Sequence, residues 1–249
     1  MTKPISIMIG MPMYGGQCFS NCFISCIALT NLLRNAGIGF RIMHLTNESM
    51  ITRARNQIAK QLMKSDCTHL LFIDADMGFD AEGVMRMIDA DVDVLAAVYP
   101  KKSYDISKGV QAIRDGYPVE GFMEYCTTMT FYPHKDIDLE STDWSKPVEV
   151  RFAGTGLMLI KREVFETMQP YVPSFVDDED KGAKTYGFFL NDVDPDSGKM
   201  MGEDHYFCQK WREAGGKVHA AAWVVVNHMG THVFNGPIHR EPNGGKQNG

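Results

Sequence analysis

The stretch Thr68–Gly78, THLLFIDADMG, decides how the rest of the chain is interpreted. Its four consecutive apolar residues, Leu70 to Ile73, predict a strand that is buried on both faces, as in a parallel sheet. Two carboxylates, Asp74 and Asp76, follow with one small residue between them. Because ligands in open α/β sheets bind outside the carboxyl ends of the strands, both acids stand where chemistry is expected. Their oxygens could point at one hard cation such as Mg²⁺ or Mn²⁺.

A structural interpretation of the same acids competes with the functional one. Asp is common in turns and helix caps, and Asp80 could cap a following helix. A D-x-D pattern also arises often by chance. Its position directly after a buried strand favours function, and the other motifs have to decide between the two interpretations.

Composition limits the class of protein. The 249 residues suffice for one large α/β domain, and 44% hydrophobic with 22% charged residues is typical of globular proteins. The 31 acidic against 25 basic residues argue against a nucleic-acid partner bound through a basic surface. No apolar run approaches the length of a transmembrane segment, and the N-terminus lacks a signal peptide's apolar region. We therefore expect a soluble, cytoplasmic protein.

Apolar runs and helical patterns alternate along the chain. They predict strands at 5–11, 38–45, 70–73 and 92–98, and helices at 17–35, 50–64 and 80–88. This alternation with short connections indicates an α/β fold, with a mostly parallel sheet and helices on both faces.

The later part of the chain is less regular. It predicts strands at 148–153, 157–160 and 218–226, and helices at 162–168 and 202–214. Residues 99–146 suit hairpins or an acceptor-facing insertion, and the Asp-, Gly- and Pro-rich residues 170–199 suit a mobile lid. We expect a single domain over residues 1–234 and a flexible C-terminal tail over 235–249.

Polar side chains lie early on the second predicted helix, at Arg53, Arg55 and Asn56. Arg53 and Asn56 are three residues apart and share a helix face. Beside a phosphate site, an arginine would give charge-assisted hydrogen bonds and Asn56 could bind a base or ribose. A solvated helix face is the competing interpretation, but the position ahead of the D-x-D strand favours a ligand.

Two acids, Glu203 and Asp204, open the last predicted helix. Acids at a helix start also complement the macrodipole. The preceding Gly202 suggests a chain that comes close to a ligand, where a carboxylate could deprotonate a sugar hydroxyl as a general base.

Two histidines, His228 and His232, follow the last predicted strand. One of them returning to the acids would complete an Asp/His metal site. Gly230 favours a loop over a helix here, so we expect one histidine to bind, His228 before His232. Farther upstream, Gly154 marks either a close approach of the backbone to substrate or a β-bulge.

The order of these motifs carries a family resemblance. In chain order they are Pro12-Met13-Tyr14, Arg53-Ala54-Arg55-Asn56, Asp74-Ala75-Asp76, Gly154-Thr155-Gly156, Gly202-Glu203-Asp204 and Asn227-His228-Met229-Gly230. Together they resemble a GT-A fold glycosyltransferase, similar to the family-2-like enzymes of bacteria and large viruses or phages. The resemblance covers roughly residues 5–234.

The resemblance implies a metal-dependent enzyme of the hexosyltransferase type. It would move a sugar from a nucleoside-diphosphate sugar, carried by UDP or GDP, to a hydroxyl of a glycan or other acceptor, with Mn²⁺ or Mg²⁺ as cofactor. If the chain is viral, its compartment would be the host cytoplasm. The donor would be bound by Pro12, Met13, Tyr14, Arg53, Asn56, Asp74, Ala75, Asp76 and Gly154. The metal would be bound by Asp76 with His228 or His232, and the base would be Asp204 or Glu203.

Several properties stay open at this point. The stretch Leu45–Glu48 departs from many relatives, which place an acidic residue near the base there, so the nucleoside is undetermined. A non-catalytic nucleotide-sugar binding module is one alternative. A haloacid-dehalogenase-like phosphohydrolase, with the first Asp as nucleophile, is another, but Met77-Gly78 after three strands fits that family poorly.

Overall fold

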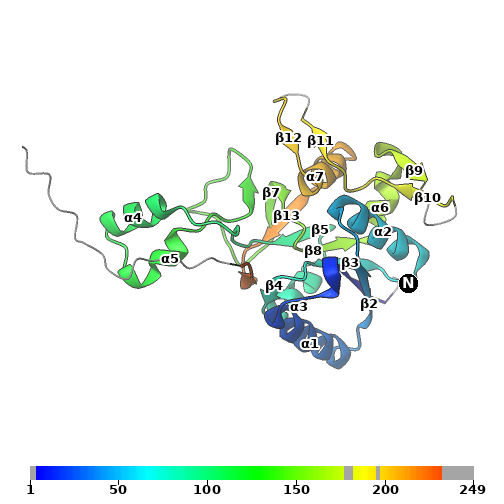
Figure 1. The fold of residues 1–249 in the computed structure, drawn as a ribbon, viewed down its shortest axis with the longest axis horizontal. Coiled ribbons are helices and arrows are strands. Elements are labelled where there is room, and N and C mark those ends of the chain that lie inside the picture. Colours follow the sequence, from blue (N-terminus) through cyan, green and yellow to red (C-terminus); the bar gives the residue numbers. More distant parts are fainter. Residues whose placement is uncertain (1–3, 177–181, 195–196, 232–249) are drawn as a thin grey trace, which may run out of the picture.

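The centre of the protein is an eight-stranded mixed sheet in the order β2-β1-β3-β8-β5-β13-β7-β6 (Figure 1). A computed structural model describes residues 4–176, 182–194 and 197–231. The strands of the sheet are β1 Ser6–Met13, β2 Gly39–Thr46, β3 His69–Ile73, β5 Val94–Ala97, β6 Phe131–Pro133, β7 Val148–Ala153, β8 Leu157–Lys161 and β13 Val218–Ala221.

Strand directions confirm an α/β fold and refine it. β1 pairs in parallel with β2 and β3, and β13 pairs in parallel with β5. β8 lies antiparallel between β3 and β5, and β7 is antiparallel to β13 and β6. β8 can take this central place because Leu157 to Ile160 are all buried, as a strand covered by helices on both faces requires.

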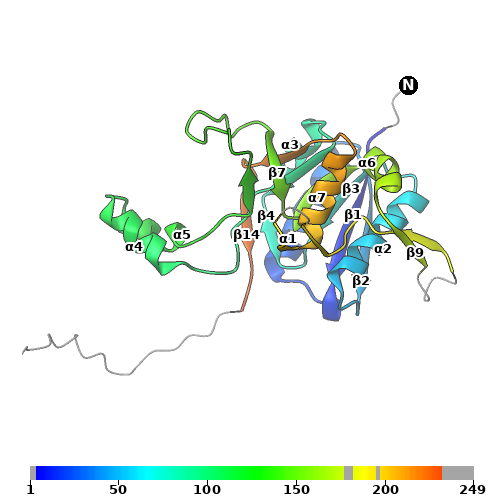
Figure 2. The same ribbon diagram turned by 90° about the horizontal axis from the view of Figure 1, so that it is seen from above.

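Helices cover both faces of the sheet, as expected (Figures 1 and 2). They are α1 Ser20–Asn35 and α3 Ala81–Asp89 on one face, and α2 Ile51–Lys64, α6 Arg162–Met168 and α7 Glu203–Glu213 on the other. The alternating side chains of β3 divide between the two cores: Leu71 and Ile73 pack on the α1 side, whereas Leu70 and Phe72 pack on the α2 side.

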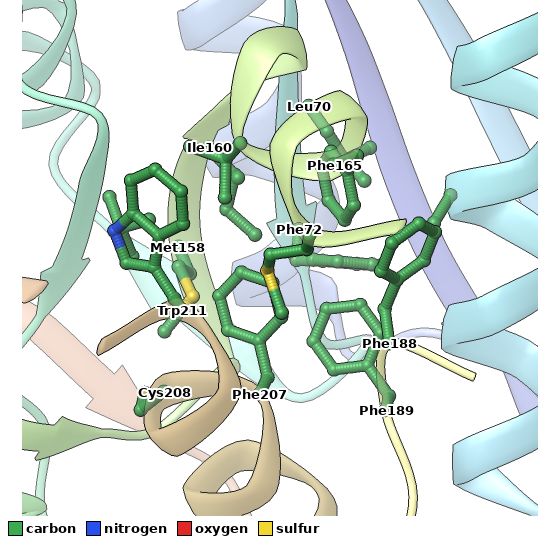
Figure 3. Packing of buried hydrophobic residues seen from close by; sticks show 14 of the residues in the cluster. Leu70, Phe72, Met158, Ile160, Phe165, Phe188, Phe189, Phe207, Cys208 and Trp211 are labelled. Atoms are coloured by element: carbon green, nitrogen blue, oxygen red, sulfur yellow. The ribbon is translucent and has the colours of Figure 1, made fainter. Parts of the chain in front are cut away.

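The core on the α2 side is aromatic (Figure 3). Phe72 meets Phe189 edge-on at 5.3 Å between ring centroids, and Phe189 stacks on Phe207 of α7 at 4.7 Å. Phe165 of α6 packs edge-on against Phe188 at 5.1 Å. This core therefore ties α6 and α7 to the strand that carries the two acids.

Residues 170–199 are not one loop, which corrects our expectation for this segment. After the short 3-10 helix η3 Gln169–Tyr171, strand β9 Ser174–Val176 pairs with β10 Lys184–Tyr186. β11 Asp192–Val193 then pairs with β12 Met200–Met201. The buried rings of Phe188 and Phe189 anchor the chain between these hairpins, so a lid over the whole segment is excluded. Residues 177–181 and 195–196 lie outside the described ranges.

Residues 100–130 leave the sheet and form an insertion of short helices that projects away from it (Figures 1 and 2). The insertion contains α4 Ile106–Arg114, η2 Val119–Gly121 and α5 Phe122–Tyr125. Its two ends are held side by side: Lys101 N donates to Thr128 O at 2.8 Å, and Thr130 N donates to Tyr99 O at 2.8 Å.

The predicted strand over 218–226 is two strands. β13 ends at Ala221, and β14 Val226–His228 pairs antiparallel with β4 Met77–Phe79, directly after the acids. The break is stabilised by Trp223, whose Nε1 donates to Gly83 O at 3.2 Å. None of the described helices combines the length and apolarity needed to cross a bilayer. The predicted tail, 235–249, lies outside the described ranges.

Candidate functional site

The turn that carries the two acids is fixed by distant parts of the chain. Asp74 N donates to Gly156 O at 2.8 Å, and Ala75 O accepts from Phe19 N at 2.9 Å. Asp76 O accepts from Met229 N at 2.8 Å. The backbone of the D-x-D segment is therefore held before any ligand binds.

Arg55 is a buried cation at the centre of the site, with 3% of its side chain exposed. Its Nη2 donates to Asp74 at 3.0 Å, and its Nε lies 3.5 Å from Glu203 Oε1. Burial alone would lower the pKa of Arg55, but Asp74 and Glu203 raise it above its ordinary value. One permanent positive charge thus joins the D-x-D turn to the start of α7.

The neighbours of Arg55 take other roles than we expected. Arg53 pairs with Glu48. Asn56 is buried, and its amide donates to Phe189 O at 2.8 Å and accepts from Phe189 N at 2.9 Å. These bonds commit the Asn56 side chain to the fold rather than to a ligand.

The sequence does indicate that Arg55 is buried. The interpretation of Arg53 and Asn56 as one helix face drew attention away from it. It stands three, four and seven residues before Ile58, Ala59 and Leu62, which form the buried face of α2. An arginine in register with an apolar stripe has to find a buried partner.

A pocket of about 470 Å³ opens beside the D-x-D turn and is lined by Pro12, Tyr14, Asp74, Ala75 and Asp76 among others. These residues are brought together as the motif order led us to expect.

Met13 faces elsewhere, which corrects its expected place. It lines a separate pocket of about 410 Å³ with Phe23, Ile27 and Ile42, between α1 and β2. The reason is the two-residue period of β1, which puts Met13 on the same side of the strand as Met11, another residue of this pocket, and Pro12 on the opposite side.

Asp76 and His228 form a two-sided corner. Asp76 Oδ1 is buried and has no hydrogen-bond partner in the described part of the chain. His228 Nε2 lies 3.6 Å from this oxygen, and His228 Nδ1 lies 2.8 Å from Pro100 O. Since a carbonyl oxygen only accepts, Nδ1 carries the proton, and the lone pair of Nε2 faces Asp76 in neutral His228.

This corner fits a divalent cation by its donors. In the neutral form of His228, a carboxylate oxygen and an imidazole nitrogen face each other as two electron-pair donors. Among the described residues, no group of three His, Cys, Asp or Glu side chains gathers closely enough to hold a metal alone. Two protein ligands suffice for Mg²⁺ or Mn²⁺ when substrate phosphates and water complete the shell. His232 lies outside the described ranges, so only His228 can be placed.

The two acids of α7 differ in their surroundings. Glu203 is held by Arg55, whereas Asp204 takes part in no ion pair within the described residues and accepts from its neighbour His205 N at 2.8 Å through Oδ1. Its second oxygen is better placed to accept a proton than a carboxylate already committed to a buried cation.

Tyr99, which no sequence motif singled out, contacts the site: its ring packs edge-on against the His228 ring, with 5.3 Å between the ring centroids. Its buried hydroxyl accepts from Gly156 N at 3.1 Å. Burial, and then the negative charge of Asp74, raise the pKa of Tyr99 well above its ordinary value, so the phenol stays protonated.

Gly154 makes room for Tyr99 and is not among the residues that line the pocket beside the D-x-D turn. A Cβ atom on Gly154 would lie 2.1 Å from Tyr99 Oη, and one on Gly156 would lie 2.3 Å from Met77 Cε. The expected close approach exists, but to a side chain of the protein itself.

Known proteins match this chain through their structures. No protein-family model and no curated protein matches it. A197 from STIV matches over 95% of this chain and 100% of its own, with 18% identity and a TM-score of 0.46. The catalytic domain of Drosophila β1,4-galactosyltransferase 7, crystallised with xylobiose, matches over 87% of this chain and 65% of its own, with 14% identity and a TM-score of 0.45. GalNAc-T7 with UDP, GalNAc and Mn²⁺ matches over 90% and 44%, with 13% identity and a TM-score of 0.49.

The matched structures thus include glycosyltransferases of the GT-A type across most of the chain, as the motif order led us to expect. This chain spans less than two thirds of the length of each of the two named transferase chains. At these TM-scores and identities, the matches alone carry no inference about activity.

Proposed function

We propose that the chain is a metal-dependent glycosyltransferase of the hexosyltransferase type, which moves a sugar from a nucleoside-diphosphate sugar to an acceptor hydroxyl. One observation carries the proposal. The D-x-D turn after β3 brings the buried Oδ1 of Asp76, which has no hydrogen-bond partner among the described residues, against His228, while Arg55 links Asp74 to Glu203 at the start of α7.

The donor would enter the pocket beside Pro12 and Tyr14. The exposed Tyr14 ring offers a face for the base, and the diphosphate of a UDP- or GDP-sugar would extend toward Asp76. A bound Mn²⁺ or Mg²⁺ held by Asp76 and His228 would stabilise the negative charge that develops on the leaving diphosphate. Arg55 donates a hydrogen bond to Asp74 and orients this carboxylate beside it.

The acceptor would approach from the other side of His228. A second pocket of about 610 Å³ lies there, lined by Pro100, Lys102, Tyr104, Thr127 and His228 among others. Its hydroxyl and aromatic groups suit a glycan or another hydroxyl-bearing acceptor.

The transfer itself needs one base. The acceptor oxygen forms a bond to the anomeric carbon as the bond from that carbon to the diphosphate breaks, and the electron pair of that bond leaves with the diphosphate. The acceptor proton passes to the free oxygen of Asp204, while Glu203 and Arg55 position the start of α7.

Metal-dependent nucleotide binding tests the proposal. In a thermal-shift panel of UDP, GDP, CDP and their sugars, one nucleotide should raise the melting temperature only with Mn²⁺, because a ligand of the native state stabilises it by mass action. Asp76→Asn should abolish that shift and all transfer, yet melt normally without ligand. Asp66→Asn, a matched change at an exposed acid, should behave as wild type.

The outcomes separate the alternatives. Metal-dependent binding without transfer to any acceptor would indicate a nucleotide-sugar binding module. No shift with any nucleotide would contradict both the transferase and the binding module. Normal transfer by Asp76→Asn would contradict the assigned site.

A further inference from the structure

Lys102 places a positive charge beside Asp76. The lysine follows β5, at the same carboxyl edge of the sheet as the acids, and its Nζ pairs with Asp76 Oδ2. His228 faces the other oxygen, Oδ1. The two oxygens of one carboxylate are thus divided between a lysine and the candidate metal corner.

The path of the Lys102 side chain is built into the fold. A Cβ atom on Gly230 would lie 3.2 Å from Lys102 Cδ, so the glycine leaves space for the aliphatic stem. The neighbouring Lys101 turns the other way, with its Nζ 5.4 Å from the centre of the Tyr132 ring. The approach to Asp76 is therefore specific to Lys102.

We propose that Lys102 is an internal counter-ion of Asp76 that a divalent metal has to displace. This inference rests on the proposed function, because it assigns the metal to Asp76 and His228. An ammonium and a divalent cation on one carboxylate repel each other at short range. Lys102 can give way because its stem is flexible and 41% of its side chain is exposed.

Displacement lowers the affinity of the site for metal. In the metal-free protein the ammonium neutralises Asp76, so part of the energy of metal binding is spent on breaking this ion pair. The ion pair thereby balances the charge of Asp76 until a cation arrives.

Direct measurement of Mn²⁺ binding tests this, by calorimetry or by the electron paramagnetic resonance of free Mn²⁺. Lys102→Met should bind Mn²⁺ about threefold to fivefold more tightly than wild type, since a partly exposed ion pair contributes at most about 1 kcal/mol, which corresponds to about fivefold. Lys102→Arg keeps the charge and should stay close to wild type. Lys101→Met is the matched control and should also stay close to wild type, whereas adding Asp76→Asn should abolish binding.

Each outcome decides one point. Equal or weaker Mn²⁺ binding by Lys102→Met overturns the inference, and binding by wild type then leaves the proposed function standing. If Lys102→Met binds Mn²⁺ and wild type does not, the inference is supported in its strongest form. If neither protein binds Mn²⁺, the inference fails together with the metal site of the proposed function. Melting temperatures without metal show whether each variant is folded.

Discussion

At the scale of single residues, the site depends on the buried positive charge of Arg55, whose role the sequence motifs did not indicate. Arg55 is inside the protein, and a buried charge is tolerated only when paired and hydrogen-bonded. Asp74 and Glu203 supply the partners from 19 and 148 residues away. Nη1 remains buried without a partner in the described part of the chain, a cost that the fold accepts at this position.

Removing Arg55 should therefore destabilise the protein strongly. We expect Arg55→Met to lower the free energy of unfolding by roughly 3–5 kcal/mol, because it leaves two carboxylates without their buried cation. Urea unfolding at neutral pH measures this. Arg41→Met breaks an exposed pair, with 63% and 68% of the two side chains accessible, and should cost at most about 1 kcal/mol. Equal losses in both variants would contradict the central role of Arg55.

At the scale of elements, β3 carries the candidate site at one end and a buried histidine at the other. The acids follow Ile73, while His69 begins the strand at the opposite edge of the sheet. His69 is buried and its Nδ1 lies 2.8 Å from Thr68 Oγ1. Burial, and then the positive charge of Lys161, lower the pKa of His69 below its ordinary value.

This lowered pKa predicts a dependence of stability on pH. The unfolded chain binds the His69 proton more readily than the folded one, so acid favours unfolding. The stabilising contribution is complete above the unfolded-state pKa of about 6.5 and is lost as pH falls toward the lower folded-state pKa. Between about pH 7 and pH 5, His69→Gln should lose less unfolding free energy than wild type.

Urea midpoints over this range, referred to those at pH 8 where His69 is neutral in both states, provide the measurement. Parallel profiles for the two proteins would exclude His69 as the source of the acid sensitivity.

At the scale of the whole molecule, the core and the insertion are separable. No residue of 103–127 belongs to either hydrophobic core cluster, and the ends of the insertion are already paired between Lys101 and Thr128. The pocket proposed for the donor lies beside β1 and β3, whereas the pocket proposed for the acceptor is lined partly by the insertion.

Replacing residues 103–127 with an Asn-Gly turn should therefore separate nucleotide binding, which should remain, from sugar transfer, which should be lost. The shortened protein should fold and bind nucleotide with Mn²⁺ as wild type does. Transfer should fall by at least about a hundredfold, since holding the acceptor in place supplies much of the rate. Melting curves, nucleotide titrations and transfer assays on the same preparation give the three readouts. Full transfer by the shortened protein would place the acceptor elsewhere.

Local pattern was sufficient for much of the fold. The run Leu70–Ile73 predicted β3 correctly, because a strand that is covered on both faces is apolar on both. The predicted bounds 148–153 and 162–168 agree with β7 and α6 residue for residue. The acids were placed correctly at the strand end because strand direction alone puts them at the carboxyl edge.

Tertiary structure alone decided which side chains meet there. Periodicity shows which face of an element is buried but not which distant segment covers it. The antiparallel place of β8, the return of β14 beside Asp76, and the ion pairs of Arg55 and Lys102 all join segments far apart in the chain. The sequence by itself determined the elements and the edge where the acids stand, and long-range packing determined the partners that make those acids a site.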